Sequence, residues 1–178
     1  MRLRRLTLRN FRAWKEQIID FGHGPGDVGH AVVNGENGAG KSSLIEGILW
    51  VLYGTTRSSA AGSVLRTGAA DVFGEVEFNA GPVRYMVRRK YTARGKGRGE
   101  LHLYRQAGAQ WMAASEGNKR ETQAAVVALI GVDEEAMLAS AFARQGHPGL
   151  AAAQPEDRRR VLRKALGLEP WAELARQK

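Results

Sequence analysis

The sequence has no cysteine among its 178 residues. This absence excludes disulfide bonds, zinc sites built from thiolates and cysteine nucleophiles. No apolar run approaches the roughly 20 residues that a membrane-crossing helix needs. No signal core of about 7–15 apolar residues follows the basic residues 1–5. We therefore expect a cytoplasmic protein that has no membrane partner.

Aromatic and acidic residues are also scarce. Aromatic residues make up only 7% of the chain, and 18 acidic residues stand against 27 basic ones, which leaves a net charge of +9. A positive field of this size favours polyanionic partners such as nucleic acid, anionic lipid or nucleotides. A basic protein without any such partner is the alternative that composition leaves open.

The remaining composition is that of a folded domain. Hydrophobic residues account for 43% of the chain and charged residues for 25%, which are ordinary values. A chain of this length buries roughly 70% of its unfolded surface when it folds, which is enough for a core. The composition therefore excludes a disordered tail, a collagen-like fibre and a disulfide scaffold.

Hydrophobic periodicity predicts an α/β fold with an antiparallel part. Alternating apolar residues indicate two short strands and then a meander, at residues 3–9, 18–21 and 73–105. Helical spacing indicates a helix over residues 41–53, which Gly54 ends, with Leu44, Ile45 and Leu52 among the residues of its apolar face. Later helices are expected at residues 118–130, 133–142 and 155–166. The serine- and glycine-rich residues 55–68 are predicted to form a loop.

A glycine-rich motif precedes the first of these helices. Residues 35–42 match G-x-x-x-x-G-K-[ST] at every fixed position, which chance produces in about one per cent of chains this long. A short apolar run at residues 30–33 leads into the motif, as a strand would. The phosphate-binding loop that this pattern predicts would bind ATP through Asn37, Gly38, Ala39, Gly40, Lys41, Ser42 and Ser43.

Each part of this loop has a physical role. Glycines let successive backbone N–H groups turn toward the phosphates, and the helix N-terminus adds a partial positive charge. Lys41 can reach the β- and γ-phosphates, and the Ser42 hydroxyl can bind Mg²⁺. The alternative is a glycine turn that caps a helix and binds nothing. We interpret the motif as a nucleoside triphosphate site.

Hydrolysis would also need a carboxylate at the end of a buried strand. Residues 125–134 resemble such a strand ending in Asp133 and Glu134. The helix-forming residues before this stretch and Gly131 within it favour a helix that stops at the glycine, with Asp133 as the N-cap of the next helix. On this interpretation the chain holds no catalytic carboxylate of its own.

The chain as a whole resembles the N-terminal lobe of the SbcC family, the ABC-type ATPases of double-strand-break repair. The residues that carry the resemblance are, in chain order, 8–12, 34–46, 52–54, 144–146, 155–159 and 166–168. The loop motif occurs in many families, but the order and spacing of the full set is much more specific. The resemblance implies an ABC-type P-loop lobe at residues 1–168, with a mixed or antiparallel sheet around the P-loop helix. It also implies that residues 169–178 begin a coiled-coil helix.

The resemblance also implies functional residues and partners. Gln145 matches the glutamine that completes the Mg²⁺ shell and senses the γ-phosphate, and is expected to be catalytic together with Lys41. Arg12 matches an arginine near the nucleotide, and Arg66 and Thr67 match, loosely, a segment that returns toward it. The implied partners are the C-terminal lobe of the same ATPase, a second head in an ATP-dependent dimer, an SbcD-like nuclease and double-stranded DNA. An ATPase of this kind would be associated with the nucleoid.

The sequence departs from the family mainly by stopping early. The family's second lobe carries the signature motif, the acidic strand end and the switch histidine, and none of these is present in the 178 residues. We therefore expect half of an ATPase head, either a fragment or one chain of a two-piece assembly. Such a half would bind nucleotide weakly and hydrolyse it only together with the missing lobe.

A basic segment between residues 84 and 105 is the candidate DNA interface. Alternation along a strand would place Arg84, Arg88 and Lys90 on one side and Arg89 on the other. The DNA contacts that we predict are Arg89, Lys90, Arg94, Lys96 and Arg98. Binding of this type would be independent of sequence and sensitive to salt. The alternative is a solvated sheet edge whose charges discourage aggregation.

Three other functions stay open. One is a RecF-like or chromosome-maintenance ATPase head. The stretches at residues 144–146 and 155–159 favour SbcC over this alternative. Another is a non-catalytic nucleic-acid-binding module with a structural P-loop. The third is a small-molecule kinase, which the long basic meander argues against.

Overall fold

The computed structural model describes residues 1–22, 33–36, 38–56, 61–115, 117–140, 154–166 and 168. The chain forms two compact units, Met1–Val126 and Val127–Lys178. Six strands and two helical segments belong to the first unit, and helix α2 (Lys119–Ile130) spans the boundary between the units. Among the described residues, no helix is both long enough and apolar enough to cross a membrane.

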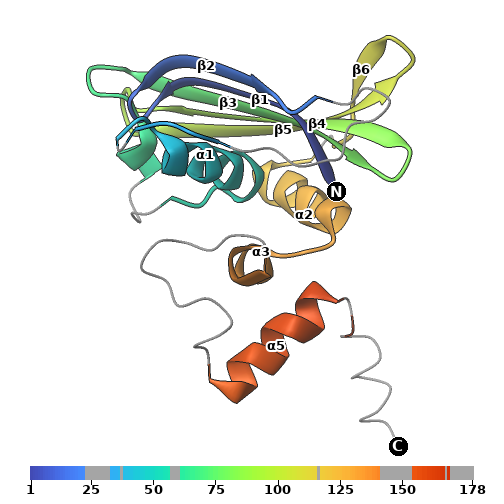
Figure 1. The fold of residues 1–178 in the computed structure, drawn as a ribbon. Helices are drawn as coiled ribbons and strands as arrows, with labels where there is room; N and C mark the ends of the chain where they lie inside the picture. Colours follow the sequence, from blue (N-terminus) through green and yellow to red (C-terminus); the bar gives the residue numbers. More distant parts are fainter. Residues whose placement is uncertain are drawn as a thin grey trace, which may run out of the picture. The chain divides into compact units, whose positions relative to one another are not determined.

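The first unit is built on one antiparallel sheet (Figure 1). Its strands are β1 (Arg2–Phe11), β2 (Trp14–Asp20), β3 (Asp71–Ala80), β4 (Val83–Thr92), β5 (Arg98–Ala107) and β6 (Gln110–Ala113). The strand order is β2-β1-β3-β4-β5-β6, and every neighbouring pair is antiparallel. The predicted meander is confirmed. The prediction missed β6, which is only four residues long and pairs through a tight turn with the end of β5.

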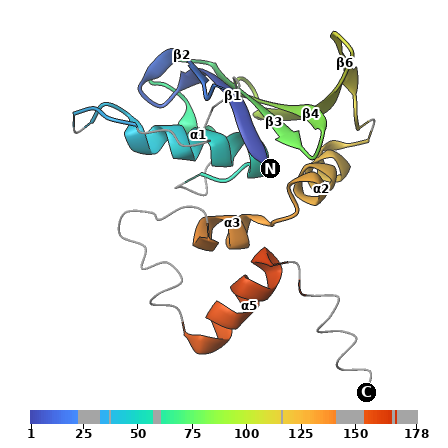
Figure 2. The same ribbon diagram turned by 45° about the vertical axis from the view of Figure 1, so that its right-hand side comes forward.

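Helix α1 (Lys41–Tyr53) covers one face of this sheet (Figures 1 and 2). Two glycines bring helix and sheet close together. A Cβ on Gly47 would lie 2.5 Å from Cδ1 of Leu8, and a Cβ on Gly74 would lie 2.4 Å from Cγ2 of Val51. Leu8 and Val51 are fully buried at this contact. The two glycines therefore set how closely α1 lies on the sheet.

The helix has its predicted boundaries, but its apolar face is wider than predicted. Gly54 ends it in the left-handed region, at φ 81°, and donates its N–H to the Trp50 carbonyl at 2.8 Å. Ile45, which we placed on the buried face, is 36% exposed, whereas Trp50 and Val51 are buried. The buried residues lie around most of the circumference of the helix and not along a single stripe, so the buried surface is wider than helical spacing predicts.

The predicted loop at residues 55–68 contains local structure. A 3-10 helix, η1 (Ala61–Val64), occupies its middle, and Leu65 then forms a bridge with Phe11 at the end of β1. The serine- and glycine-rich composition does not indicate this bridge, because the bridge depends on a partner more than fifty residues away.

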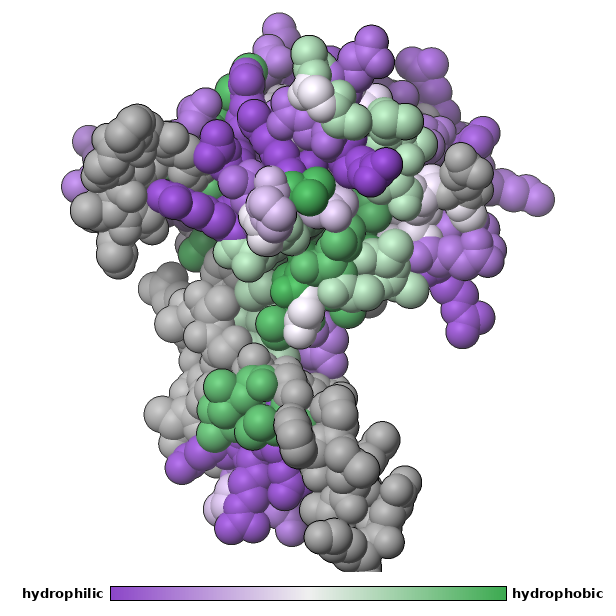
Figure 3. All heavy atoms as spheres, turned by 90° about the vertical axis from the view of Figure 1, so that its right-hand side faces the viewer, coloured by the Kyte–Doolittle hydropathy of each residue, from purple (hydrophilic) through white to green (hydrophobic). Residues whose placement is uncertain are grey.

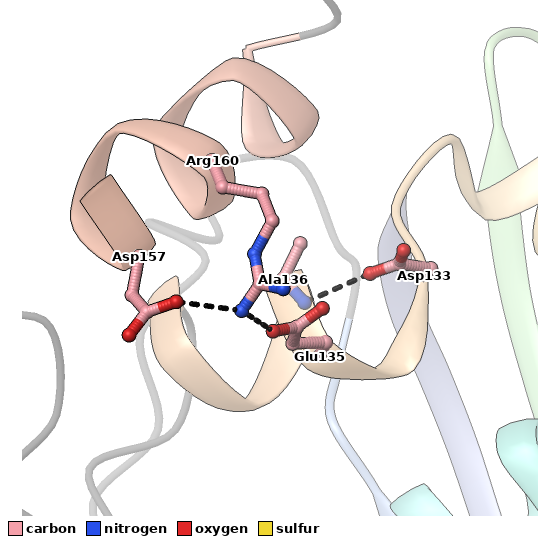
Figure 4. Close-up of polar contacts among 5 residues, drawn as sticks. All are labelled: Asp133, Glu135, Ala136, Asp157 and Arg160. Carbon is pink, nitrogen blue, oxygen red and sulfur yellow. Dashed lines mark hydrogen bonds and ion pairs between the residues drawn. The ribbon is translucent and has the colours of Figure 1, made fainter. Parts of the chain in front are cut away.

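In the second unit, helix α3 (Glu134–Ser140) packs with helix α5 (Pro155–Ala165). Asp133 caps α3 by accepting the Ala136 N–H at 2.9 Å (Figure 4). Arg160 joins the two helices through Glu135, at 2.7 Å, and also bonds Asp157 within α5, at 3.0 Å. The interpretation of Asp133 as an N-cap, and not as the acidic end of a strand, is confirmed.

Candidate phosphate-binding site

The loop before α1 has the backbone geometry that its glycines permit. Gly38 and Gly40 adopt φ values of 89° and 94°, in the left-handed region that side chains disfavour. The Gly40 carbonyl accepts the N–H groups of Ser43 and Leu44, at 2.8 and 3.2 Å, and so starts the helix. The first N–H groups of a helix have no intrahelical partner. Those of α1 therefore open onto the loop, where an anion is favoured.

The side chain of Lys41 folds back across the loop. Its Nζ donates to the carbonyl oxygens of Gly35 and Glu36, at 2.7 and 2.8 Å. An ammonium group has three donors, so one remains for a phosphate. The neighbouring Ser42 is exposed, and its hydroxyl bonds no other described residue. Two other predicted site residues, Asn37 and Gln145, lie outside the described residues.

Arg12 lies in the turn between β1 and β2, and it is tied to the middle of α1. Its Nε donates to Oε2 of Glu46 at 3.2 Å, and its Nη2 pairs with the other carboxylate oxygen. Its Nη1 donates to the Ser63 carbonyl at 2.7 Å. The Glu46 side chain is only 4% exposed. Arg12 therefore fastens the turn to the P-loop helix, and its contact with nucleotide stays a prediction.

Sequence reasoning missed Glu46. A single acidic residue between Ile45 and Ile48, in an otherwise apolar helix, is the signal that could have found it. Buried carboxylates need a partner, and the only basic residue of this helix is Lys41, five residues before Glu46. The partner comes from a turn that lies 34 residues earlier in the chain.

Arg66 and Thr67 are held near the same turn. The Arg66 N–H donates to the Asn10 carbonyl at 2.8 Å, two residues before Arg12. Both side chains are exposed. The structure thus brings the segment of Arg66 to the β1–β2 turn, while the nucleotide contacts of these two residues stay predictions.

Arg89 corrects the predicted DNA interface. It is 6% exposed and faces helix α1 from β4. Its Nε donates to the Val51 carbonyl at 3.0 Å, and its Nη2 donates to Oε1 of Gln123 at 2.5 Å. Gln123 in turn donates to the Leu52 carbonyl at 2.8 Å. A side chain buried in this way cannot reach DNA, so the prediction for Arg89 is wrong.

The role of Arg89 is to hold the C-terminal end of α1. That end carries unpaired carbonyls and a partial negative charge, which a cation stabilises. Burial lowers the pKa of Arg89 to about 10, which is still far above neutral pH, so the guanidinium stays charged. The P-loop helix is therefore anchored by two arginines from the sheet side, Arg12 at its middle and Arg89 at its C-terminal end.

The other basic residues of this segment divide into two groups. Arg84 and Arg88 pair with Glu77 and Glu75 of the adjacent strand β3. In contrast, the remaining predicted DNA contacts are exposed; they are Lys90, Arg94, Lys96 and Arg98. Arg98, at 81% exposure, lies 3.5 Å from Glu100, and Lys90 lies 3.9 Å from Asp71. Within this segment, the exposed positive charge therefore lies at and near the β4–β5 turn.

One face of the first unit shows both hydrophilic and hydrophobic side chains at its surface. In the first unit, hydrophilic side chains gather around the margin of the face in Figure 3, and a hydrophobic area lies inside them. The β4–β5 turn contains two glycines with positive φ, Gly95 at 66° and Gly97 at 70°. These let the turn present its charged side chains outward.

Three comparisons with known proteins agree with one another. A family model described as an AAA domain matches residues 5–160. The DNA double-strand break repair Rad50 ATPase of Thermoplasma acidophilum is 30% identical over 170 residues, which are 95% of this chain and 18% of that protein. The SbcC component of the SbcCD nuclease of Deinococcus radiodurans is 27% identical over 169 residues, 92% of this chain and 18% of that protein. The chain thus spans about a fifth of the length of these relatives.

A solved structure shows the same fold. It comes from work on the ATP-driven dimerization and DNA-stimulated activation of SMC ATPases, and it is 20% identical in sequence with a TM-score of 0.65. The match covers 92% of this chain and 99% of that one. The antiparallel sheet and helix α1 therefore have the fold of that structure.

Proposed function

The chain belongs to the AAA-domain family of the SbcC and Rad50 ATPases, and from this premise we propose that it is the ATP-binding lobe of a DNA double-strand-break repair ATPase. The observation that carries the proposal is the loop before α1. There Lys41 is held across the loop by the carbonyls of Gly35 and Glu36, beside the open N-terminus of the helix. This arrangement suits the β- and γ-phosphates of a nucleotide.

We propose that the site also uses Mg²⁺. The residues that would hold the ion are Ser42 and Gln145, and the exposed hydroxyl of Ser42, which bonds no other described residue, supports this. When bound, the ion bridges phosphate oxygens and neutralises charge that develops on them. Lys41 contributes a further positive charge, and the helix N–H groups orient the phosphates.

The names of the relatives support the proposed partners. One relative is a double-strand break repair ATPase and another is a component of a nuclease, SbcCD. The SMC structure concerns ATP-driven dimerization and stimulation by DNA. By analogy, we propose that this lobe joins a second head when ATP binds, and that the dimer acts with an SbcD-like nuclease on DNA in the cytoplasm. The comparisons do not support a RecF-like head better than an SbcC-like one.

The proposed DNA contacts are the exposed basic residues at and near the β4–β5 turn. They are Lys90, Arg94, Lys96 and Arg98, without Arg89. Two of these charges have a distant acidic neighbour: Arg98 lies 3.5 Å from Glu100 and Lys90 lies 3.9 Å from Asp71. Contacts of this kind would follow the phosphate backbone without reading the bases.

Nucleotide-dependent thermal stabilisation tests the nucleotide site. A ligand at 100 times its Kd stabilises the folded state by about 2.7 kcal/mol, which raises Tm by roughly 5–10 °C for a chain of this size. We expect Mg·ATP to produce this shift in the wild type and in Lys96→Ala, a lysine outside the loop. Lys41→Ala should lose it. A wild type that Mg·ATP does not stabilise would instead favour a structural P-loop in a nucleic-acid-binding module.

A further inference from the structure

Gln123, on helix α2, joins that helix to the C-terminal end of the P-loop helix. Its side-chain amide donates to the Leu52 carbonyl at 2.8 Å and accepts a hydrogen bond from Nη2 of Arg89 at 2.5 Å. Arg89 donates in turn to the Val51 carbonyl at 3.0 Å. Helices α1 and α2 lie on the same side of the sheet (Figure 1), and Gln123 belongs to the first unit. Two neighbouring carbonyls of α1 are thus held by one chain of hydrogen bonds.

The charge in this cluster is balanced by dipoles. Arg89 is 6% exposed, and its partners among the described residues are a backbone carbonyl and the neutral amide of Gln123. A cation at the C-terminal end of a helix is stabilised by the partial negative charge of the last carbonyls. That stabilisation falls off with distance, so it depends on where the end of α1 lies. The cluster therefore responds to any shift of the P-loop helix along its axis.

The first residue of α2 lies beside the end of the β4–β5 turn. A Cβ on Gly99, which follows Arg98 on β5, would stand 2.8 Å from Nζ of Lys119. Lys119 and Gln123 are four residues apart, so they lie on the same side of the helix. Thr122, between them, is only 2% exposed, which fixes this turn of the helix against the rest of the unit. The start of α2 therefore reaches from the basic turn to the end of α1.

Strand β4 gives a second connection between the same two places. Lys90, one of the proposed DNA contacts, directly follows Arg89 in the strand. Successive residues of a strand point to opposite faces, so Lys90 is exposed while Arg89 is buried against α1. A ligand that fixes the β4–β5 turn therefore also fixes the backbone that carries Arg89.

We propose that Gln123 and Arg89 couple the β4–β5 turn to the P-loop, so that DNA bound at the turn and nucleotide bound at the loop strengthen each other's binding. This inference rests on the nucleotide and DNA sites proposed above. Helix α1 has 13 residues and is about 20 Å long. Close-packed interiors transmit strain, so a restraint on its last carbonyls also restrains the N–H groups that face the phosphates.

The sign of the coupling follows from preorganisation. DNA at the turn holds the start of α2 and the end of β4, and through Gln123 and Arg89 it holds the C-terminal end of α1. The nucleotide then meets a helix whose position is already fixed, which lowers the cost of binding. Coupling of this kind is reciprocal and typically amounts to about 5- to 150-fold in affinity.

The test measures the affinity of the 178-residue chain for a labelled DNA duplex by fluorescence anisotropy, with and without saturating Mg·ATP. Both titrations use the same free Mg²⁺ and ionic strength, because salt alone changes the affinity for DNA. In the wild type, Mg·ATP should lower the Kd for DNA by about 5- to 150-fold. Gln123→Leu loses both hydrogen bonds of the amide. It should abolish this enhancement and leave the affinity for each ligand alone unchanged.

Two variants serve as matched controls. Gln106→Leu makes the same change at a half-buried glutamine of β5, whose side chain bonds no other described residue. Thr122→Val removes the hydrogen bond from the Ser115 hydroxyl, at 3.1 Å, in the same turn of α2 as Gln123. Both variants should keep the enhancement. Hydrogen exchange of the wild type needs no substitution, and Mg·ATP should slow the exchange of the amides of residues 119–126.

Each other outcome overturns the coupling. If Mg·ATP leaves the wild-type affinity for DNA unchanged or weakens it, the two sites are independent or compete. If Gln123→Leu keeps the enhancement, these hydrogen bonds do not carry it, and if Thr122→Val also loses it, Gln123 only stabilises α2. If Gln123→Leu does not fold, unchanged exchange of residues 119–126 with Mg·ATP overturns the proposal. Failure of the proposed function looks different, because the wild type would then not bind Mg·ATP, or not bind DNA, when each is titrated alone.

Discussion

The pair of Arg12 and Glu46 should contribute unequally to stability. Removing one partner of a buried ion pair costs about 3–5 kcal/mol, because a charge stays buried without compensation. Here Glu46 is 4% exposed and Arg12 is 29% exposed. Arg12→Met removes the guanidinium from the buried carboxylate, and the partial access of water lowers the cost to roughly 2–4 kcal/mol. Glu46→Gln leaves an arginine that can turn toward water, so it should cost less, about 1–2 kcal/mol.

Urea unfolding of the two variants measures this difference. For a chain of this size the loss in Arg12→Met corresponds to a fall in Tm of about 4–16 °C. The double variant Arg12→Met/Glu46→Leu should be more stable than Arg12→Met alone, since apolar residues that replace both members of a buried pair are often tolerated. The reasoning would be refuted if Arg12→Met stayed within about 0.5 kcal/mol of the wild type, as surface substitutions do. It would also fail if Glu46→Gln were the more damaging change.

Two further outcomes follow from the basic segment. Arg89→Met leaves the Val51 carbonyl without a buried donor, so urea unfolding should show a loss of roughly 1–3 kcal/mol in the free energy of unfolding. The DNA affinity of the folded variant should stay unchanged. A variant with reduced DNA affinity and unchanged stability would show that Arg89 contacts DNA after all. Reversing the charges of Arg94, Lys96 and Arg98 together should weaken DNA binding. It should also make the salt dependence less steep, reducing the magnitude of the negative slope of log K against log salt by about 2–3. Lys15→Glu, on β2, is the control for a single reversed charge elsewhere on the sheet. If the triple variant kept the DNA affinity and salt slope of the wild type, the β4–β5 turn would not contact DNA.

Local pattern was sufficient for most elements of the fold. The alternation of residues 73–105 and the spacing of residues 41–53 predicted the meander and α1, because a strand repeats about every two residues and a helix about every 3.6. Gly54 and Asp133 were recognised as helix boundaries for the same reason: their preferred backbone or side-chain geometry is local. Even the alternation of Arg88 and Arg89 onto opposite faces of β4 agreed with the structure.

The sequence pattern could not predict which residues surround each face of the sheet. Arg88 and Arg89 are adjacent and chemically identical, yet one pairs with Glu75 and the other is buried against α1. Their different surroundings depend on which face of the sheet the helix covers. The bridge of Leu65 with Phe11 likewise joins segments that are far apart in the sequence. Composition cannot specify a contact of that kind.

The sequence alone predicted the phosphate-binding loop, because a backbone that curls around phosphates needs glycine, lysine and a hydroxyl at set positions within eight consecutive residues. The tertiary structure decided what surrounds that loop. Packing of α1 on the sheet brought Trp14 against Gly40 and Arg12 against Glu46, and it turned Arg89 inward. Each of these contacts joins residues more than twenty positions apart, so each exists only once the hydrophobic core has closed between helix and sheet.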